Sequence, residues 1–487
     1  MIERFIHTRR ARLIVALSAI LIAAGVFYYY VGRQGPSYKE VIIALSALIL
    51  AVIVFGRELG IRYGFVLWVL TLALGYRTLY VTVDLPIHPS EVLLWVLLVC
   101  ILVQRRLISN APLAFPVWLW MFIPFWVLGW WPMIAGGAPW DRMLNEFRNF
   151  LLIVPLIIVA SVVLKRERYW RYLLLAFFIM SSWIALMGIL EYWVPQVTGL
   201  FPAFIRDAAP KLTEEGFARA QFSFWGGAPA TFICVLALPC AIVLAKWWPR
   251  WSRRVVIIAC ALLQIVAIYI GGYRSIWLLL LVQALAACLL GFRKQSAMVA
   301  LLCLVVFIGG YELVPRTSER AMSGIAALQG HPTDSSAVGR KYRALEALGS
   351  TIEAPFGSGW STAGWVHSDF LQVSANLGII AGLIFLGGYF FTLLRLGQRV
   401  LPRLRAGEGD LGLSLLLSFI AVGGILAMEG VTVLPQSVLP VWFVWALTEV
   451  WLRQKAEARE LNGAAVAPSF SYQLASVQLS ASLKTDV

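Results

Sequence analysis

Charged residues are scarce in this chain. Of its 487 residues only 13% are Asp, Glu, Lys or Arg, whereas 60% are hydrophobic, and the mean hydropathy is +0.81. A soluble domain with this balance could not cover its surface with polar groups. Apolar runs of about 17–22 residues recur from Leu13 to Trp451, each long enough to cross a hydrocarbon layer about 30 Å thick. The scarcity of charge thus excludes a soluble protein and predicts an all-α integral membrane protein.

Cysteines and acidic clusters are scarce too. The outer segments assigned below contain no acidic cluster, so we expect neither a metal nor another cofactor. The net charge of +15 comes from basic residues between the apolar runs, which indicates membrane topology and not nucleic-acid binding. Six cysteines lie in apolar segments without metal-ligand spacing, which argues against a disulfide framework or a zinc site: Cys100, Cys234, Cys240, Cys260, Cys288 and Cys303.

The apolar runs predict 12–14 transmembrane helices. The fourth run is short, and the last two could form one re-entrant pair. The fourteen candidates lie near residues 13–31, 41–55, 63–79, 91–103, 113–131, 148–164, 172–192, 225–245, 255–271, 275–291, 297–314, 371–394, 411–428 and 437–452.

The basic residues predict the orientation of these spans. With a cytoplasmic N-terminus, the inner segments carry 25 Lys and Arg residues and the longer outer segments carry 13. Because cytoplasmic loops are enriched in Lys and Arg, both termini are expected inside the cell.

The division of the chain follows from the spans. Residues 1–314 would hold about eleven spans, with an outer loop near 193–223. Residues 315–370 would form a large periplasmic loop, and loops of this length are often functional. Residues 371–453 would hold the C-terminal spans, and residues 454–487 a cytoplasmic tail, expected to be disordered.

His367 is the histidine best placed for chemistry. It stands in GWSTAGWVHSDFLQVSANLGII, where a glycine-rich outer loop meets a span, with Asp369 close behind it. An imidazole at a membrane interface beside a carboxylate can accept a proton near pH 7. A helix-capping or interfacial histidine is the alternative.

Four arginines share the predicted outer side with His367, against the usual bias. Arg274 in GGYRSIW has almost no loop around it, so it would face a cavity or anchor at the interface. Arg219 and Arg148 each enter a span, and Glu146 could neutralise Arg148. Arg340 lies in the second outer loop, where it could also belong to a solvated helix face. Arginines that converge in a low dielectric suit a phosphate or diphosphate.

These segments resemble the bacterial O-antigen ligase and O-antigen polymerase superfamily. The resemblance covers residues 219–386 and rests on the order of RAQFSFWGGAPATFICVLALP, GGYRSIW, GRKYRALEALGSTIEAPFGSGW and VHSDFLQVSANLGIIAGLIFL. It departs from the family at Ser223, where many relatives have glycine, and at residues 226–229, which replace an asparagine-bearing turn. These departures put the role of Arg219 in doubt.

The resemblance implies an inverting, metal-independent glycosyltransferase of the bacterial inner membrane. Its donor would be a saccharide on undecaprenyl diphosphate at the periplasmic face, and its acceptor a lipid A–core oligosaccharide or a second lipid-linked chain. Arg219 and Arg274 would hold the diphosphate, Arg340 would assist, and His367 would deprotonate the acceptor hydroxyl. Arg148 and Asp369 would support the site.

A transporter or flippase for a lipid-linked saccharide is the alternative function. Such a protein should place polar residues within spans near the midplane and show two matching halves. The spans here are poor in charge and no repeat is evident, which favours the enzyme.

Reporter fusions would test the orientation. Fusions after Arg171, Arg254 and Arg405 should report the cytoplasm, because each follows a basic inner segment. Fusions within residues 333–363 should report the periplasm. Reversed signals within 333–363 would place the second loop on the wrong side for the donor and contradict the assignment.

Overall fold

The structure is a computed structural model. It describes residues 58–72, 79–82, 85–104, 115–131, 140–194, 196, 211–212, 218–220, 222, 227–290, 326, 335–405, 410–432 and 435–466. The predicted spans 13–31, 41–55 and 297–314 lie outside these residues, as do most of the two predicted outer loops before residue 335 and the end of the predicted tail.

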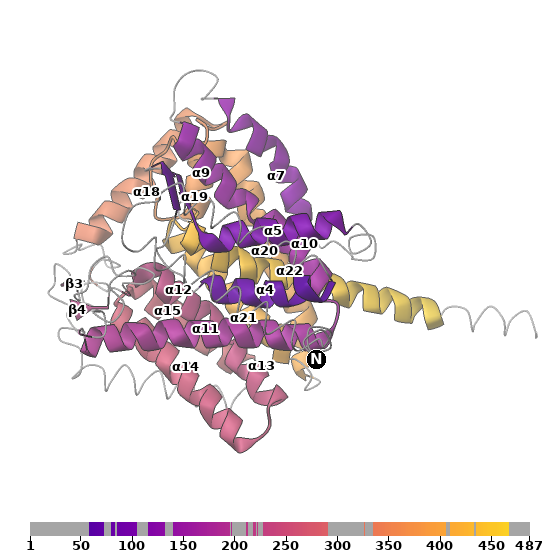
Figure 1. Ribbon diagram of the computed structural model, residues 1–487. Coiled ribbons are helices and arrows are strands. Elements are labelled where there is room, and N and C mark those ends of the chain that lie inside the picture. The colour runs from indigo at the N-terminus through magenta and orange to yellow at the C-terminus, as the bar shows by residue number, and fades with distance from the viewer. Residues whose placement is uncertain are drawn as a thin grey trace, which may run out of the picture.

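The described chain is helical apart from two short strand pairs (Figure 1). Strand β1 (Leu79–Thr82) pairs antiparallel with β2 (Leu85–Ile87), and β3 (Lys211–Leu212) with β4 (Ala218–Arg219). The helices are α4 (Glu58–Thr71), α5 (Pro89–Val103), α7 (Val117–Leu128), α9 (Trp140–Leu151), α10 (Ile153–Val163), α11 (Glu167–Trp193), α12 (Gly227–Ala237), α13 (Cys240–Trp247), α14 (Trp251–Gly271), α15 (Arg274–Leu289), α18 (Ser335–Glu353), α19 (Asp369–Leu377), α20 (Ile379–Arg405), α21 (Asp410–Met428) and α22 (Pro435–Val466).

Five described helical segments are long and apolar enough to cross a membrane, which indicates a multi-pass membrane protein. They are Trp140–Val163, Glu167–Trp193, Trp251–Gly271, Ile379–Leu404 and Leu411–Met428, and the pair α12 and α13 could form a sixth span bent by 43°. Four shorter apolar helices fall on the predicted spans near 63–79, 91–103, 113–131 and 275–291.

The part of α22 that matches the last predicted span is surrounded by protein. Every residue from 437 to 452, the last predicted span, is buried. The helix packs against α10, α12 and α21, and Trp442 and Trp445 form an aromatic cluster with Phe385 of α20. Because neighbouring helices shield it from lipid, α22 can carry a buried polar residue such as Glu449, which accepts a hydrogen bond from Thr392 (2.6 Å).

The predicted span near 371–394 is wrong at both ends, because the apolar helix α20 runs from Ile379 to Arg405. A break at Gly378 separates it from α19. Gly378 has φ +95°, and a Cβ there would lie 2.7 Å from the Pro355 carbonyl oxygen. That oxygen accepts a hydrogen bond from the Ile379 N–H at 3.0 Å. The backbone of the glycine-rich loop thus packs into the break at Gly378, where a side chain larger than that of glycine would collide with it.

Side chains of α15 and α21 form hydrogen bonds to the backbone of the bend between α12 and α13. Pro239 has no N–H, so the Val235 carbonyl four residues earlier loses its helical donor. The Gln283 side chain supplies a replacement at 3.1 Å. Two serines one turn apart on α21 bond further carbonyls of the bend: Ser414 donates to Pro239 and Ser418 to Leu236, both at 2.8 Å.

Several segments predicted to lie on opposite sides of the membrane lie at opposite ends of the bundle in Figure 1. In Figure 1, α18 and the β3–β4 pair lie at the left end and the C-terminal part of α22 at the right. At the right end, Arg62 and Arg168, from two predicted inner loops, both donate to the Tyr169 hydroxyl. The other end holds the predicted outer residues described next.

Candidate functional site

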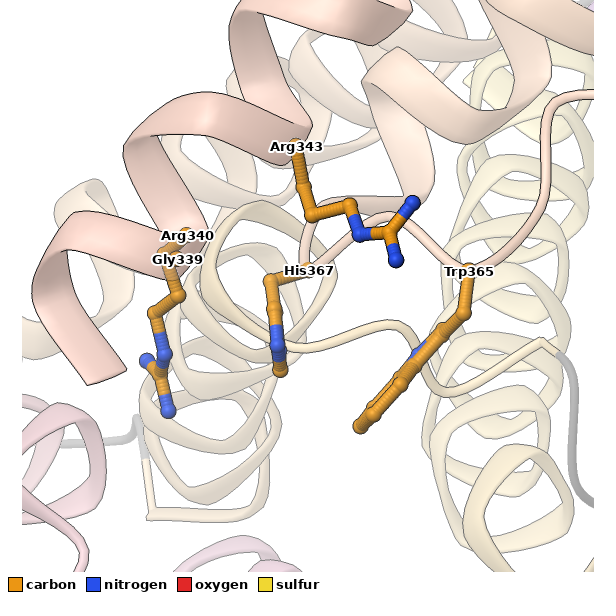
Figure 2. A pocket seen from close by; sticks show the side chains of 5 residues that line it. All are labelled: Gly339, Arg340, Arg343, Trp365 and His367. Atoms are coloured by element: carbon orange, nitrogen blue, oxygen red, sulfur yellow. The ribbon is translucent and has the colours of Figure 1, made fainter. Parts of the chain in front are cut away.

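A pocket of about 330 Å³ lies between α18 and the loop that precedes α19. Helix α18 contributes Gly339, Arg340 and Arg343, and the loop contributes Trp365 and His367 (Figure 2). His367 stands between Arg340 and Trp365 in this view, and the His367 and Trp365 rings are 4.4 Å apart. Three basic side chains and one aromatic wall thus line one cavity, which brings together two of the predicted site residues, His367 and Arg340.

The His367 imidazole is half-buried, and its Nδ1 atom is buried without a hydrogen-bond partner in the described part of the chain. Burial lowers the pKa of His367 below its usual value, and the charges of Arg340 and Arg343 lower it further. The ring is therefore neutral at pH 7 and can accept a proton. Its surroundings are cationic, so the expectation that a neighbouring carboxylate raises its basicity is wrong.

The Asp369 carboxylate instead holds the turn after α21. Its oxygens accept hydrogen bonds from the Val431 N–H (3.1 Å), the Thr432 N–H (3.0 Å) and the Thr432 hydroxyl (2.5 Å). Burial raises the pKa of Asp369 to about 7, although these hydrogen bonds lower it. The geometry makes Asp369 a residue that positions α19 and, through α19, the loop that carries His367.

Glu429 begins the same turn and connects the pocket with α15. Its Oε1 atom lies 3.5 Å from Nη2 of Arg340 and accepts a 2.7 Å hydrogen bond from the Ser275 hydroxyl. Burial raises the pKa of Glu429, whereas Arg340 and Ser275 lower it. Ser275 directly follows Arg274, the half-buried first residue of α15. Glu429 therefore brings the start of α15 to the Arg340 side of the pocket.

Two amide side chains on α19 fix the loop that carries His367. Gln372 accepts from the Val366 N–H at 2.7 Å and donates to the Gly364 carbonyl at 2.6 Å. Asn376, one turn later, accepts from the Ala363 N–H at 2.9 Å. The backbone before His367 is thus held at three points by the polar face of one helix.

Arg148 lies away from the pocket. Its Nε atom is 3.1 Å from Oε1 of Glu91, and its Nη2 atom donates to Asn145 at 2.8 Å. The hypothesis that Glu146 neutralises Arg148 is wrong, because Glu146 accepts a hydrogen bond from Asn376 at 2.7 Å. Arg148 therefore supports the fold of α9 and α5 and contributes nothing to the pocket lining.

For Arg219, the structure describes the backbone alone. It pairs with Lys211 in the β3–β4 ribbon, and the N–H of the next residue, Ala220, donates to the Ile270 carbonyl at 2.9 Å. Ile270 stands at the end of α14, just before the left-handed turn at Gly272 that leads into Arg274. The two predicted diphosphate ligands, Arg219 and Arg274, therefore come from neighbouring stretches of backbone.

The sequence reasoning missed three residues of this region: Arg343, Trp365 and Glu429. Glu429 had a usable signal, since a carboxylate directly after an apolar span on the predicted outer side needs a cationic partner. Arg343 had the same signal as Arg340, since both are arginines of one run on the predicted outer side. Trp365 had none, because only the folded arrangement separates it from other loop residues.

No protein-family model matches the chain, and a search of curated proteins finds no match. In the described part of the chain, no three His, Cys, Asp or Glu side chains group as metal ligands would.

Replacing Asp369 should destabilise the fold. Asp369→Ala would leave two buried backbone N–H groups without acceptors, at a cost of roughly 2–6 kcal/mol. We expect a lower melting temperature in detergent, measured by fluorescence-detected size exclusion. Thr432→Val, which removes only the hydroxyl donor, should cause a smaller drop. An unchanged melting temperature for Asp369→Ala would show that the carboxylate does not hold the turn.

Proposed function

We propose that this protein is an inverting, metal-independent glycosyltransferase of the O-antigen ligase and polymerase type. It would transfer a saccharide from undecaprenyl diphosphate to a sugar hydroxyl at the outer face of the bacterial inner membrane. The observation that carries the proposal is the pocket in which the neutral His367 imidazole, with a buried unpartnered nitrogen, lies beside Arg340 and Arg343. A proton acceptor and an anion-binding pair are the two parts that such a transfer needs.

Arg340 and Arg343 supply the positive charge for the diphosphate. Arg343 pairs with Glu346 at 3.0 Å on the exposed helix face, and the ion pair of Arg340 among the described residues is the longer 3.5 Å contact to Glu429. The Nε atom of Arg340 is buried without a hydrogen-bond partner among the described residues. A guanidinium with spare donors can form bidentate bonds to phosphate oxygens. Arg274, which directly precedes Ser275, and Arg219 would contribute further hydrogen-bond donors to the diphosphate.

His367 would act as the general base. The acceptor hydroxyl gives its proton to the imidazole as its oxygen attacks the anomeric carbon, and the bond from that carbon to the phosphate oxygen breaks. The lipid diphosphate leaves with the electron pair, stabilised by the arginines, and the anomeric configuration inverts. The negative donor also offsets the repulsion from Arg340 and Arg343, so the pKa of His367 rises when the donor binds.

The distribution of basic residues supports an orientation of the protein in the membrane. The end of the bundle that holds the pocket would face the periplasm, with both termini in the cytoplasm and 12–14 spans in the whole chain. The donor, the lipid bilayer and a lipid A–core or second lipid-linked acceptor would be the partners. A flippase for the same donor would use the arginines but would need no base.

Removing the imidazole tests the assignment. His367→Ala should lower transfer by roughly 10²–10⁴-fold with donor binding largely retained, because the arginines remain. Product should be measured per unit of monodisperse protein with a lipid-linked oligosaccharide donor. The yield of folded protein should stay near that of the wild type in His367→Ala and should fall in Asp369→Ala, because Asp369 holds the turn after α21. Full transfer by His367→Ala would remove His367 as the base, and flipping of the donor without transfer by the wild type would favour the flippase.

The pH dependence of transfer tests the arrangement of charges. The base must be unprotonated, so kcat/KM should fall only below the lowered pKa of His367, on the acid side of 6.5. Arg340→Gln removes one repelling charge, so the pKa rises and the acid limb should shift to higher pH. Arg142→Gln removes an exposed charge that does not line the pocket, so the acid limb should stay at the wild-type pH. An acid limb of kcat/KM at the same pH in Arg340→Gln and in the wild type would contradict the proposed arrangement of charges.

A further inference from the structure

A second pocket, of about 450 Å³, lies at the end of the bundle opposite His367, where α11, α13, α20, α21 and α22 meet. Both ends are connected by α21: Gly412 lines this pocket and Glu429 lies at the first one. Seventeen residues of helix separate them, or about 25 Å. That distance is close to the thickness of a bilayer core, about 30 Å, so the second pocket lies near the opposite membrane surface.

The lining of this pocket is strongly basic. Among the described residues that line it, five are cationic and one is a carboxylate: Lys165, Arg171, Lys246, Arg403 and Lys455 against Glu167.

Among the described lining residues, the one carboxylate is already paired with one of the five cations. Glu167 is engaged by Arg171 at 2.7 Å. Burial lowers the pKa of Lys455, and the nearby charge of Arg403 lowers it further, although Glu167 opposes this. An anion in the pocket would relieve this repulsion.

Helix dipoles do not decide the sign of the field here. Helices α11 and α21 begin at the pocket, whereas α10, α13 and α20 end there, so their terminal partial charges oppose each other. Among the described lining residues, the positive potential therefore comes from the basic side chains.

Tryptophans and apolar side chains form the rest of the lining. Arg171 lies over the Trp247 ring at 5.4 Å and Arg403 over the Trp451 ring at 5.6 Å. Trp is enriched at the depth of lipid headgroups. Val243, Val400 and Leu411 add apolar surface beside the cations. A soluble anion would make no contact with this apolar surface. A lipid would place its headgroup on the cations and its glycerol and upper acyl carbons against the apolar side chains.

We propose that this pocket binds the phosphate headgroup of an anionic phospholipid in the leaflet opposite the His367 pocket. Basic pockets between membrane helices suit such headgroups. The proposal does not depend on the glycosyltransferase assignment, because the two pockets lie at opposite ends of the bundle and share no lining residue.

Native mass spectrometry and thermal stability of the full-length detergent-solubilised protein test the site. Added phosphatidylglycerol should remain bound and raise the melting temperature by at least about 2 °C, whereas phosphatidylcholine should do neither. Lys246→Gln/Lys455→Gln should weaken phosphatidylglycerol binding about tenfold or more. Lys246→Arg/Lys455→Arg should retain it, which separates loss of charge from loss of fold.

Arg253→Gln/Arg254→Gln is the matched control. It removes two exposed charges from the predicted inner segment that also holds Lys246, but neither arginine lines the pocket, and it should bind phosphatidylglycerol like the wild type. Equal loss in this control would show unspecific surface attraction and overturn the site. Equal stabilisation by inorganic phosphate alone would show a site for a free anion and overturn the lipid assignment.

Discussion

The arrangement of the candidate site depends on one buried carboxylate, that of Asp369. Its three hydrogen bonds fix the turn of residues 429–432 against the start of α19. The same turn accepts a hydrogen bond from Asn149 of α9 at the Thr432 carbonyl (2.7 Å) and one from the Trp365 indole at the Gly430 carbonyl (3.3 Å). Buried polar groups must be paired, and a turn that satisfies donors from several helices can adopt only one position. Glu429 stands at the start of this fixed turn, which determines where Arg340 finds its counter-charge.

The electrostatics of the His367 pocket follow from this arrangement. The turn offers one carboxylate to the pocket, and it is shared between Arg340 and Ser275. Arg343 has its own carboxylate partner, Glu346, on the exposed helix face, and both guanidinium groups still lower the pKa of the His367 imidazole. Such a site is unsuited to cationic ligands, and the anion binding proposed above would not require a large rearrangement of the backbone, since Gln372 and Asn376 already hold the loop.

Hydropathy and spacing predicted the helical membrane class because each apolar run must be long enough to cross the bilayer. They failed at α19 and α20, where the apolar run continues through Gly378 and only the contact with the loop around Pro355 reveals the break. His367 and Arg340 were predicted as site residues, and they do line one pocket. The roles of Asp369 and Glu146 were misread because sequence proximity to His367 and Arg148 suggested contacts that the fold gives to Thr432 and Asn376 instead. Which carboxylate pairs with which base depends on long-range packing, and local spacing does not encode it.

The bend between α12 and α13 has a mechanical consequence. A proline break in a membrane helix commonly acts as a hinge, because the unpaired carbonyls can exchange donors as the two halves move. Here the carbonyls of Val235, Leu236 and Pro239 are already bonded by Gln283, Ser418 and Ser414. With little water in the bilayer to replace them, opening the bend would expose these polar groups to hydrocarbon. The bend is therefore a fixed corner that joins α12, α13, α15 and α21, and we expect larger movements of the bundle to come from elements outside this group.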